Sequence, residues 1–149
     1  MKRPSFMSGL LLSTILCGSL VAQSIPAGWK LVKDDKGRCR VAVPPDWSAP
    51  SPNAGAASAK NQADGSLVVT NDPFTLKPLP ESMQKIMKVG NMFENTTKRV
   101  FYSTRSGSFT SYNVSVPGNT GTCNTKVTFS PSVPESTAKD IALSIGPVK

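Results

Sequence analysis

The stretch CNTKVTF at residues 123–129 and the stretch RCRVAV at residues 38–43 decide the fold. In both stretches apolar and polar side chains alternate with a period of two, which is typical of a strand that buries one face. The alternation puts Cys39 and Cys123 on the apolar faces of their strands. We therefore expect two strands whose cysteines point into the core.

These two cysteines predict a disulfide. The third cysteine, Cys17, lies in the apolar N-terminal run and is removed if that run is cleaved. Cys39 and Cys123 then allow a single intramolecular pairing. The chain has no Cys-x-x-Cys spacing, which argues against a redox-active or metal-binding pair. We expect a structural Cys39–Cys123 bridge, which the chain-entropy model credits with about 4–5 kcal/mol.

Outward from these strands, apolar runs between Gly- and Pro-bearing turns predict four more, at residues 29–33, 66–70, 98–105 and 109–116. Short Gly-containing turns between the last three strands favour an antiparallel meander. With two helices between and after the strands, the order predicts a single α+β domain. We expect an antiparallel sheet of about five to six strands packed with two helices.

The first helix is predicted to begin near Pro80, and its helical-spacing stripe is Met83, Ile86, Met87, Gly90 and Phe93. We expect this stripe to be core, and an adaptable methionine-rich binding surface is the alternative. The second helix is predicted to begin with a capping box formed by Ser132 and Glu135. Its expected buried stripe is Ala138, Ile141, Ala142 and Ile145.

Residues 48–65 are rich in Ala, Ser, Asn, Gly and Pro and show no hydrophobic period, which predicts a flexible surface insertion. Trp47 stands just before this insertion, and Trp29 stands at the start of the first strand. We expect both indoles to be buried at the ends of the core, because tryptophan is highly buried on average. The alternative is a pair of exposed rings that stack on sugars or anchor a partner.

The first 22 residues predict a destination outside the cytoplasm. Lys2 and Arg3 precede an apolar run at residues 10–21, and the run ends at Ala22, an order typical of a secretory signal peptide. The run is too short and too interrupted to remain as a membrane anchor. We therefore expect a secreted or periplasmic domain at residues 23–149. A lipid anchor on Cys17 is the less favoured alternative.

The mature domain is predicted to be basic. Without Lys2 and Arg3, the 17 basic residues become 15 against 9 acidic residues, so the net charge is +6. Such a charge serves solubility or attracts an anionic partner. The residues that would form a basic surface site are Lys30, Arg38, Arg40, Lys98 and Arg105. They do not form a run, and secretion argues against a nucleic-acid partner.

Three short motifs carry a family resemblance: PAGW at residues 26–29, VPPDW at residues 43–47 and SIGPVK at residues 144–149. With the order of strands and helices, the chain resembles the PsbP-like fold superfamily. The resemblance implies a twisted antiparallel sheet packed with helices, and a binding or accessory role rather than catalysis. It carries over no functional residue, and the long insertion departs from the compact family pattern.

The chain contains no histidine, and Gly-x-Ser-x-Gly, Gly-rich phosphate loops and EF-hand loops are absent. Asp34 and Asp35 stand in a Gly turn, where turn geometry is favoured over a calcium site. We predict no catalytic residue, metal ligand or cofactor. The expected function is a non-enzymatic binding or accessory protein whose partner is a protein or an anionic envelope component. The alternatives are a small secreted hydrolase using carboxylates and a basic structural protein that binds an anionic polymer of the envelope.

Overall fold

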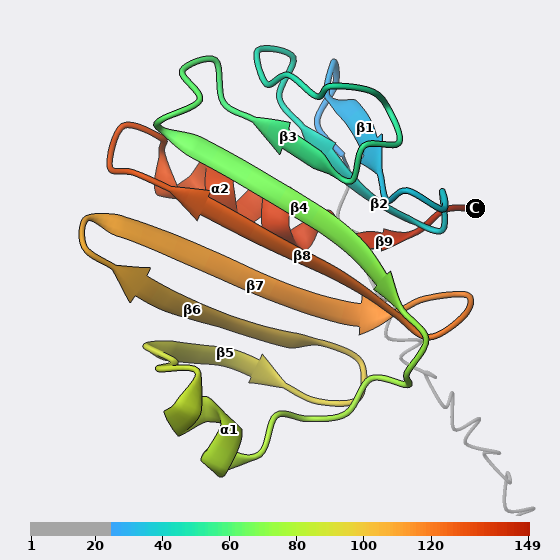
Figure 1. Ribbon diagram of the computed structural model, residues 1–149, viewed down its shortest axis with the longest axis vertical. Helices are drawn as coiled ribbons and strands as arrows, with labels where there is room; N and C mark the ends of the chain where they lie inside the picture. Colours follow the sequence, from blue (N-terminus) through green and yellow to red (C-terminus); the bar gives the residue numbers. More distant parts are fainter. Residues whose placement is uncertain (1–24) are drawn as a thin grey trace, which may run out of the picture.

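The computed structural model describes residues 25–149 (Figure 1), and the predicted signal peptide lies outside the described residues. The described chain has the expected α+β architecture, with nine strands in two antiparallel sheets and two helices. No helix in the described range is long and apolar enough to cross a membrane.

The small sheet has the strand order β1-β2-β9 and consists of β1 (Lys30–Lys33), β2 (Cys39–Val43) and β9 (Gly146–Pro147). The first two strands form an antiparallel hairpin, in which Val32 lies opposite Val41. The third strand comes from the C-terminal tail, for which the sequence analysis predicted no strand. The small sheet therefore joins the two ends of the described chain.

The large sheet has the order β3-β4-β8-β7-β6-β5. Its strands are β3 (Ala56–Ser58), β4 (Gly65–Asp72), β5 (Asn91–Asn95), β6 (Val100–Ser106), β7 (Phe109–Pro117) and β8 (Thr122–Phe129). Strands β5 to β8 form a meander, which confirms the prediction for the last three strands. Because β4 pairs with β8, the connection after β4 crosses to the opposite edge of the sheet, and this connection holds α1 (Glu81–Ile86).

The core lies between one face of the large sheet and a layer made of α2 (Glu135–Leu143) and the small sheet (Figure 1). Ala138, Ile141 and Ala142 of α2 are fully buried, as the predicted stripe requires. They pack towards β7, β8 and β2. On the other face of the large sheet, a smaller apolar cluster forms where the segment around Leu76 and Leu79 covers Tyr102 of β6.

The prediction that the first helix turns a buried stripe to the core is wrong. Helix α1 ends at Ile86, has no buried residue, and leaves the Ile86 side chain 72% exposed. The chain reverses at Lys88, which has a positive φ of 53°, and then forms the edge strand β5. Phe93 therefore belongs to the sheet, where it stacks on Phe101 with ring centroids 4.4 Å apart. Residues 91–95 therefore pair with the edge of β6 as a strand, although the apolar residues from Met83 to Phe93 have helical spacing.

The predicted capping box is also wrong. The N-cap of α2 is Pro134, and no side chain caps the helix. Ser132 instead donates its backbone N–H to the hydroxyl of Ser130. The carboxylate of Glu135 accepts a hydrogen bond from the hydroxyl of Tyr112 on β7. Glu135 therefore bonds to Tyr112 of the large sheet instead of capping the start of α2.

Residues 48–65 hold a strand that the sequence analysis did not predict. Strand β3 pairs with β4, and Ser48 and Ser58 form a further bridge. Ala57 and Ala59 are buried against the core. Alanines that bury only a methyl group leave almost no hydrophobic period in a sequence, so this strand had no visible signal.

Burial raises the pKa of Tyr112 well above its usual value near 10, and the hydrogen bond to Glu135 and its charge raise it further. The folded chain therefore holds this proton more tightly than the unfolded chain does. The resulting stabilisation is complete below pH 10 and is lost as the pH rises above 10 towards the folded-state pKa.

We expect Tyr112→Phe to show a shallower alkaline loss of stability than the wild type, because phenylalanine has no proton to lose. At pH 8 the variant should be less stable by about 1 kcal/mol, the net value of one hydrogen bond. Urea-unfolding midpoints measured from pH 8 to pH 11.5 check both expectations. Tyr102→Phe is the control for the effect of burial, because burial alone raises the pKa of Tyr102. If the unfolding midpoints of Tyr112→Phe and the wild type fell equally between pH 8 and pH 11.5, the prediction would be contradicted.

Candidate functional site

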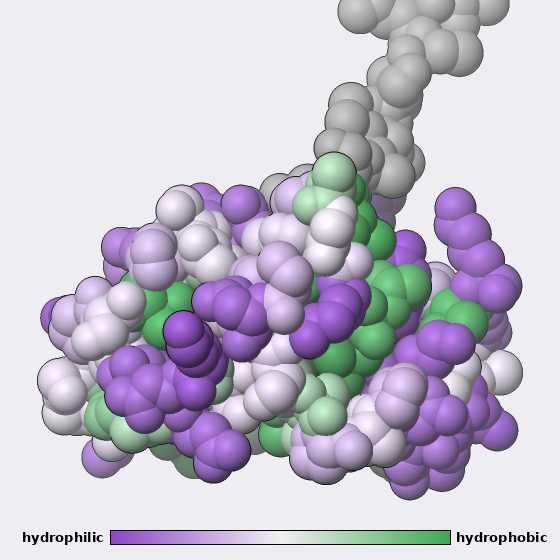
Figure 2. All heavy atoms as spheres, turned by 90° about the horizontal axis from the view of Figure 1, so that it is seen from above, coloured by the Kyte–Doolittle hydropathy of each residue, from purple (hydrophilic) through white to green (hydrophobic). Residues whose placement is uncertain are grey.

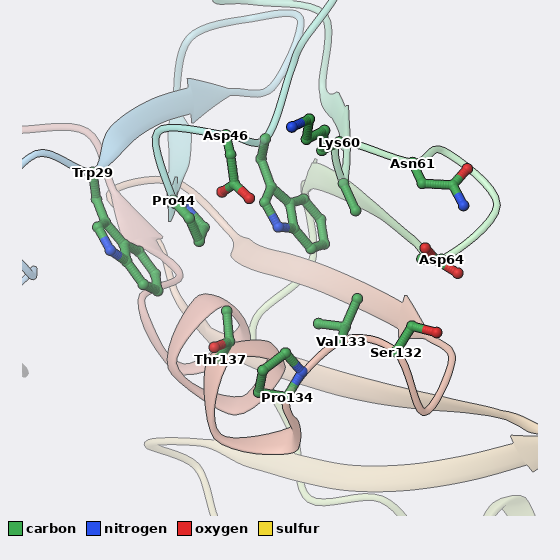
Figure 3. Close-up of a pocket in the computed structure, with 12 residues that line it drawn as sticks. Trp29, Pro44, Asp46, Lys60, Asn61, Asp64, Ser132, Val133, Pro134 and Thr137 are labelled. Atoms are coloured by element: carbon green, nitrogen blue, oxygen red, sulfur yellow. The ribbon is translucent and has the colours of Figure 1, made fainter.

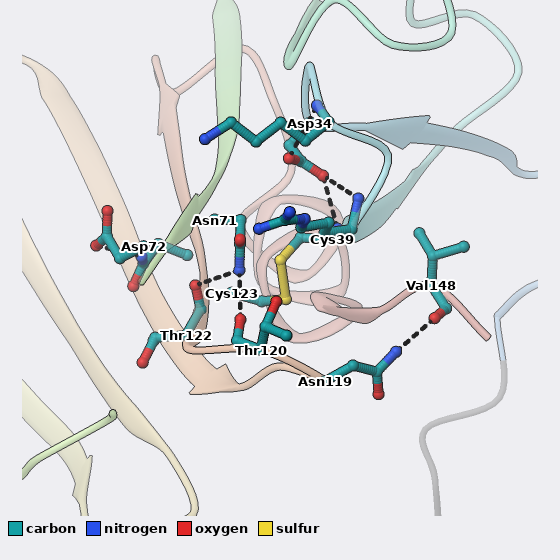
Figure 4. Close-up of a disulfide and its surroundings, with 12 residues drawn as sticks. Asp34, Cys39, Asn71, Asp72, Asn119, Thr120, Thr122, Cys123 and Val148 are labelled. Atoms are coloured by element: carbon teal, nitrogen blue, oxygen red, sulfur yellow. Dashed lines mark hydrogen bonds between the residues drawn. A yellow bond between two sulfur atoms is a disulfide. The ribbon is translucent and has the colours of Figure 1, made fainter. Parts of the chain in front are cut away.

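The predicted disulfide is present (Figure 4). Cys39 of β2 and Cys123 of β8 are bonded, with Cα atoms 5.5 Å apart, and both residues are fully buried. The bridge therefore ties the small sheet to the large sheet through the core. Between residues 25 and 149, no group of three or more His, Cys, Asp or Glu side chains is placed to hold a metal ion.

Asp34 is a structural residue rather than a metal ligand. Its side chain is buried, and its two carboxylate oxygens accept hydrogen bonds from the backbone N–H groups of Lys36, Arg38 and Cys39 (Figure 4). The bond to Cys39 measures 2.6 Å. The carboxylate thus closes the β1–β2 turn directly beside the disulfide.

Asp34→Ala is expected to destabilise the protein by about 2 kcal/mol, because buried N–H donors lose a charged acceptor. The neighbouring Asp35→Ala is a matched control, since Asp35 is exposed and surface changes usually stay within about 0.5 kcal/mol. Thermal or urea unfolding of both variants checks the difference. Equal stabilities of the two variants would show that the turn does not depend on the buried carboxylate.

The five basic residues proposed as a surface site come from different elements. Lys30, Arg38 and Arg40 belong to the β1–β2 hairpin of the small sheet, whereas Lys98 and Arg105 lie near opposite ends of β6 in the large sheet. Lys30 donates from Nζ to the carbonyl of Trp47, and the Nη1 atom of Arg40 is buried without a hydrogen-bond partner. A single anion-binding surface made of these five residues stays a prediction.

A groove of about 850 Å³ lies where the small sheet, the 59–64 loop and the start of α2 meet (Figure 3). We call it the Trp29–Trp47 groove. Its lining residues are Trp29, Pro44, Asp46, Trp47, Ala59, Lys60, Asn61, Asp64, Ser132, Val133, Pro134 and Thr137. Viewed from the end of the molecule that carries the small sheet, the surface is mostly hydrophilic with limited apolar patches between the polar groups (Figure 2).

The two tryptophans have different roles in this groove. Trp47 follows a turn closed by its backbone N–H to the carbonyl of Pro44, and its indole is only 3% exposed. Its ring packs over Gly65, where a Cβ would come within 3.2 Å of the indole. Trp29 is half-buried at the other wall (Figure 3). The prediction of burial is confirmed for Trp47, whereas Trp29 keeps part of its indole accessible.

Polar side chains complete the lining of the groove. Asp46 comes from the turn after β2, and Asn61 and Asp64 come from the 59–64 loop (Figure 3). Asp64 is held in place by Ser130, which donates its backbone N–H to the Asp64 carbonyl at 2.8 Å and its hydroxyl to the carboxylate at 3.3 Å. Ser132 and Thr137 add hydroxyl groups from the start of α2. The groove thus offers hydrogen-bond donors and acceptors beside an indole.

The groove has a different charge from the protein around it. Its ionisable side chains are Asp46, Asp64 and Lys60, which sum to a negative charge in a domain whose net charge is positive. Sequence analysis did not identify Lys60, Asn61 and Asp64 as site residues. The signal that could have found them is a cluster of polar side chains in a long loop next to a tryptophan, since loops carry many binding residues.

The groove also collects two carboxylates, which is what the hydrolase alternative requires. Asp46 comes from the turn after β2 and is exposed to solvent, whereas Asp64 comes from the 59–64 loop (Figure 3). A general acid in a glycosidase is typically buried against apolar side chains. The arrangement therefore favours binding over hydrolysis.

No protein-family model matches the chain, and no curated protein matches it. The resemblance to the PsbP-like superfamily stays a prediction from the three short motifs.

Proposed function

We propose that this chain is a secreted or periplasmic binding or accessory protein without enzymatic activity, and that the Trp29–Trp47 groove is its binding site. The observation that carries the proposal is the groove itself: a concavity that combines a partly accessible indole with convergent polar side chains. Small-molecule sites are usually concave, with a few placed polar groups among apolar walls.

Two features support a location of the protein outside the cytoplasm. A buried disulfide ties the two sheets together, and disulfides persist mainly in oxidising compartments. The N-terminal residues also have the order of a signal peptide. The mass of the exported chain tests this part, with cleavage after Ala22 as the expected result and an uncleaved chain in the cytoplasm as the contrary one. A PsbP-like relationship is part of the same proposal, and it adds a second reason to expect an accessory role.

The binding site is tested by a thermal-shift panel of sugars, metals, nucleotides, acidic glycans and lipids. A ligand that binds only the folded state raises the melting temperature, with about 2.7 kcal/mol of stabilisation at a hundredfold excess over Kd. Trp29→Ala should abolish the shift if the ligand lies in the groove. Leu31→Ala is the control, because Leu31 is an exposed apolar residue of β1 outside the groove. A shift that survives Trp29→Ala would place the site elsewhere.

The hydrolase alternative predicts a different result for Asp46→Asn and Asp64→Asn. If either carboxylate acted in catalysis, its loss would abolish turnover of a cleavable ligand while leaving binding largely intact. In a binding protein, a ligand incubated with the wild-type chain stays intact, and the substitutions alter affinity alone. Product analysis by chromatography separates the two functions.

A further inference from the structure

We infer that the ligand of the Trp29–Trp47 groove is an uncharged saccharide. This inference rests on the proposed function, and it adds the chemical class of the ligand. The volume of about 850 Å³ lies within the range of small-molecule sites, which is about 300–1,000 Å³.

The walls of the groove suit a molecule with both an apolar face and a polar rim. Trp29 offers an indole with a flat apolar body, and Pro44 and Pro134 add further apolar surface nearby. A pyranose ring presents C–H groups on its faces and hydroxyl groups at its rim. The indole can therefore contact the C–H face while the hydroxyls point to the polar side chains around it.

The hydrogen-bonding groups are mixed in the way that hydroxyls require. Asp46 and Asp64 are acceptors, Lys60 is a donor, and Asn61 provides both. A sugar hydroxyl is at once a donor and an acceptor, so it can be satisfied by such a set. A purely apolar ligand would remove water from these groups without replacing the hydrogen bonds that water makes, and this desolvation costs free energy.

The charges argue for a neutral ligand. Asp46 and Asp64 repel phosphates, sulfates and uronic acids, and the single Lys60 does not offset both carboxylates. A polycation is attracted by the groove but repelled by the rest of the domain, whose net charge is +6 once Lys2 and Arg3 are excluded from the 17 basic residues against 9 acidic ones. An uncharged ligand meets neither repulsion.

The test uses the mature chain and five probes: maltotriose, cellotriose, tri-N-acetylchitotriose, heparin and an arginine-rich peptide. Binding is measured by calorimetry and by tryptophan fluorescence. We expect saturable binding of at least one neutral trisaccharide, with a change in emission and little dependence on salt between 50 and 500 mM. Trp29→Ala should weaken that binding by at least about tenfold, which is typical of a tryptophan anchor. Trp29→Phe should retain more affinity than Trp29→Ala, because phenylalanine keeps an aromatic face.

Leu31→Ala serves as the control and should bind like the wild type. Circular dichroism confirms that each variant is folded. If none of the three trisaccharides binds, the saccharide inference is overturned. If heparin or the peptide binds instead and loses affinity in Trp29→Ala, the groove remains the site while its ligand class is wrong. If trisaccharide binding is unchanged in Trp29→Ala, the proposed site and the saccharide inference both fail.

Discussion

A double variant that carries Cys39→Ala and Cys123→Ala is expected to lose about 4–5 kcal/mol of unfolding free energy relative to the wild type. The two cysteines are 84 residues apart in the chain, so their bond restricts a large part of the unfolded ensemble. In the folded state both lie fully buried between β2 and β8. Alanine is the suitable replacement because it adds no polar atom to this apolar site.

Urea unfolding followed by circular dichroism measures the loss. Wild-type protein in excess reductant is the matched control, because it lacks the bond but keeps both side chains, and its midpoint should fall close to that of the double variant. Removal of a native disulfide from a small secreted domain typically costs about 2–5 kcal/mol. A loss under about 1 kcal/mol would mean that the two sheets are held together without the bridge.

Gly121→Ala is expected to lose at least about 3 kcal/mol, which is more than backbone conformation alone can explain. Gly121 lies in the turn between β7 and β8, with a φ of +68°. A Cβ at this position would stand 1.9 Å from the carbonyl oxygen of Asp72, at the end of β4. Because the contact is with backbone, the turn or the strand would have to move.

Gly107→Ala separates the two causes. Gly107 also has a positive φ, +59°, but a Cβ there meets nothing within 4 Å. This control should lose about 1–2 kcal/mol, the cost of the left-handed conformation for a residue with a side chain. Thermal and urea unfolding of both variants give the comparison. Equal losses would show that the β7–β8 turn can shift away from β4 at no cost.

The strands were predictable because alternation reports directly on a sheet with one buried face. Cys39–Val43 is observed as predicted, and the strands at 109–117 and 122–129 differ from their predicted bounds by one residue. The disulfide followed from the same alternation, since it placed both cysteines on core-facing sides. Ala138, Ile141 and Ala142 likewise marked the buried face of α2.

Other features depended on contacts between different elements of the fold. The stripe that includes Ile86 and Phe93 has helical spacing, but Phe93 lies in β5, which pairs with the edge of β6. Glu135 has the position of a capping residue, yet it bonds to Tyr112 from another element. The local pattern does not anticipate this competition, because each partner lies outside the pattern: Phe101 is 8 residues from Phe93, and Tyr112 is 23 residues from Glu135.

The candidate site was predictable only in part. The two tryptophans stood out, and sugar stacking was one of the alternatives considered for them. What the sequence did not reveal is that residues 60–64 fold back beside Trp47, or that the start of α2 forms the opposite wall. The groove is built from four separate segments, at residues 29, 44–47, 59–64 and 132–137, and none of them indicates a binding site by itself.

The Cys39–Cys123 bond also changes what a single protease cut can do. Residues 39–123 form a covalently closed ring, and that ring contains the long, polar 48–65 segment where a protease would find exposed backbone. One cleavage anywhere within the ring leaves both pieces in the same molecule, since the sulfur bond still connects them. Such a nicked protein would gain only the mass of one water molecule, and its two pieces would separate only after reduction. The disulfide would keep the two sheets covalently connected. Wherever a protease meets this chain, the bridge would therefore keep a chain cut within residues 39–123 in one covalent molecule, in addition to stabilising the fold.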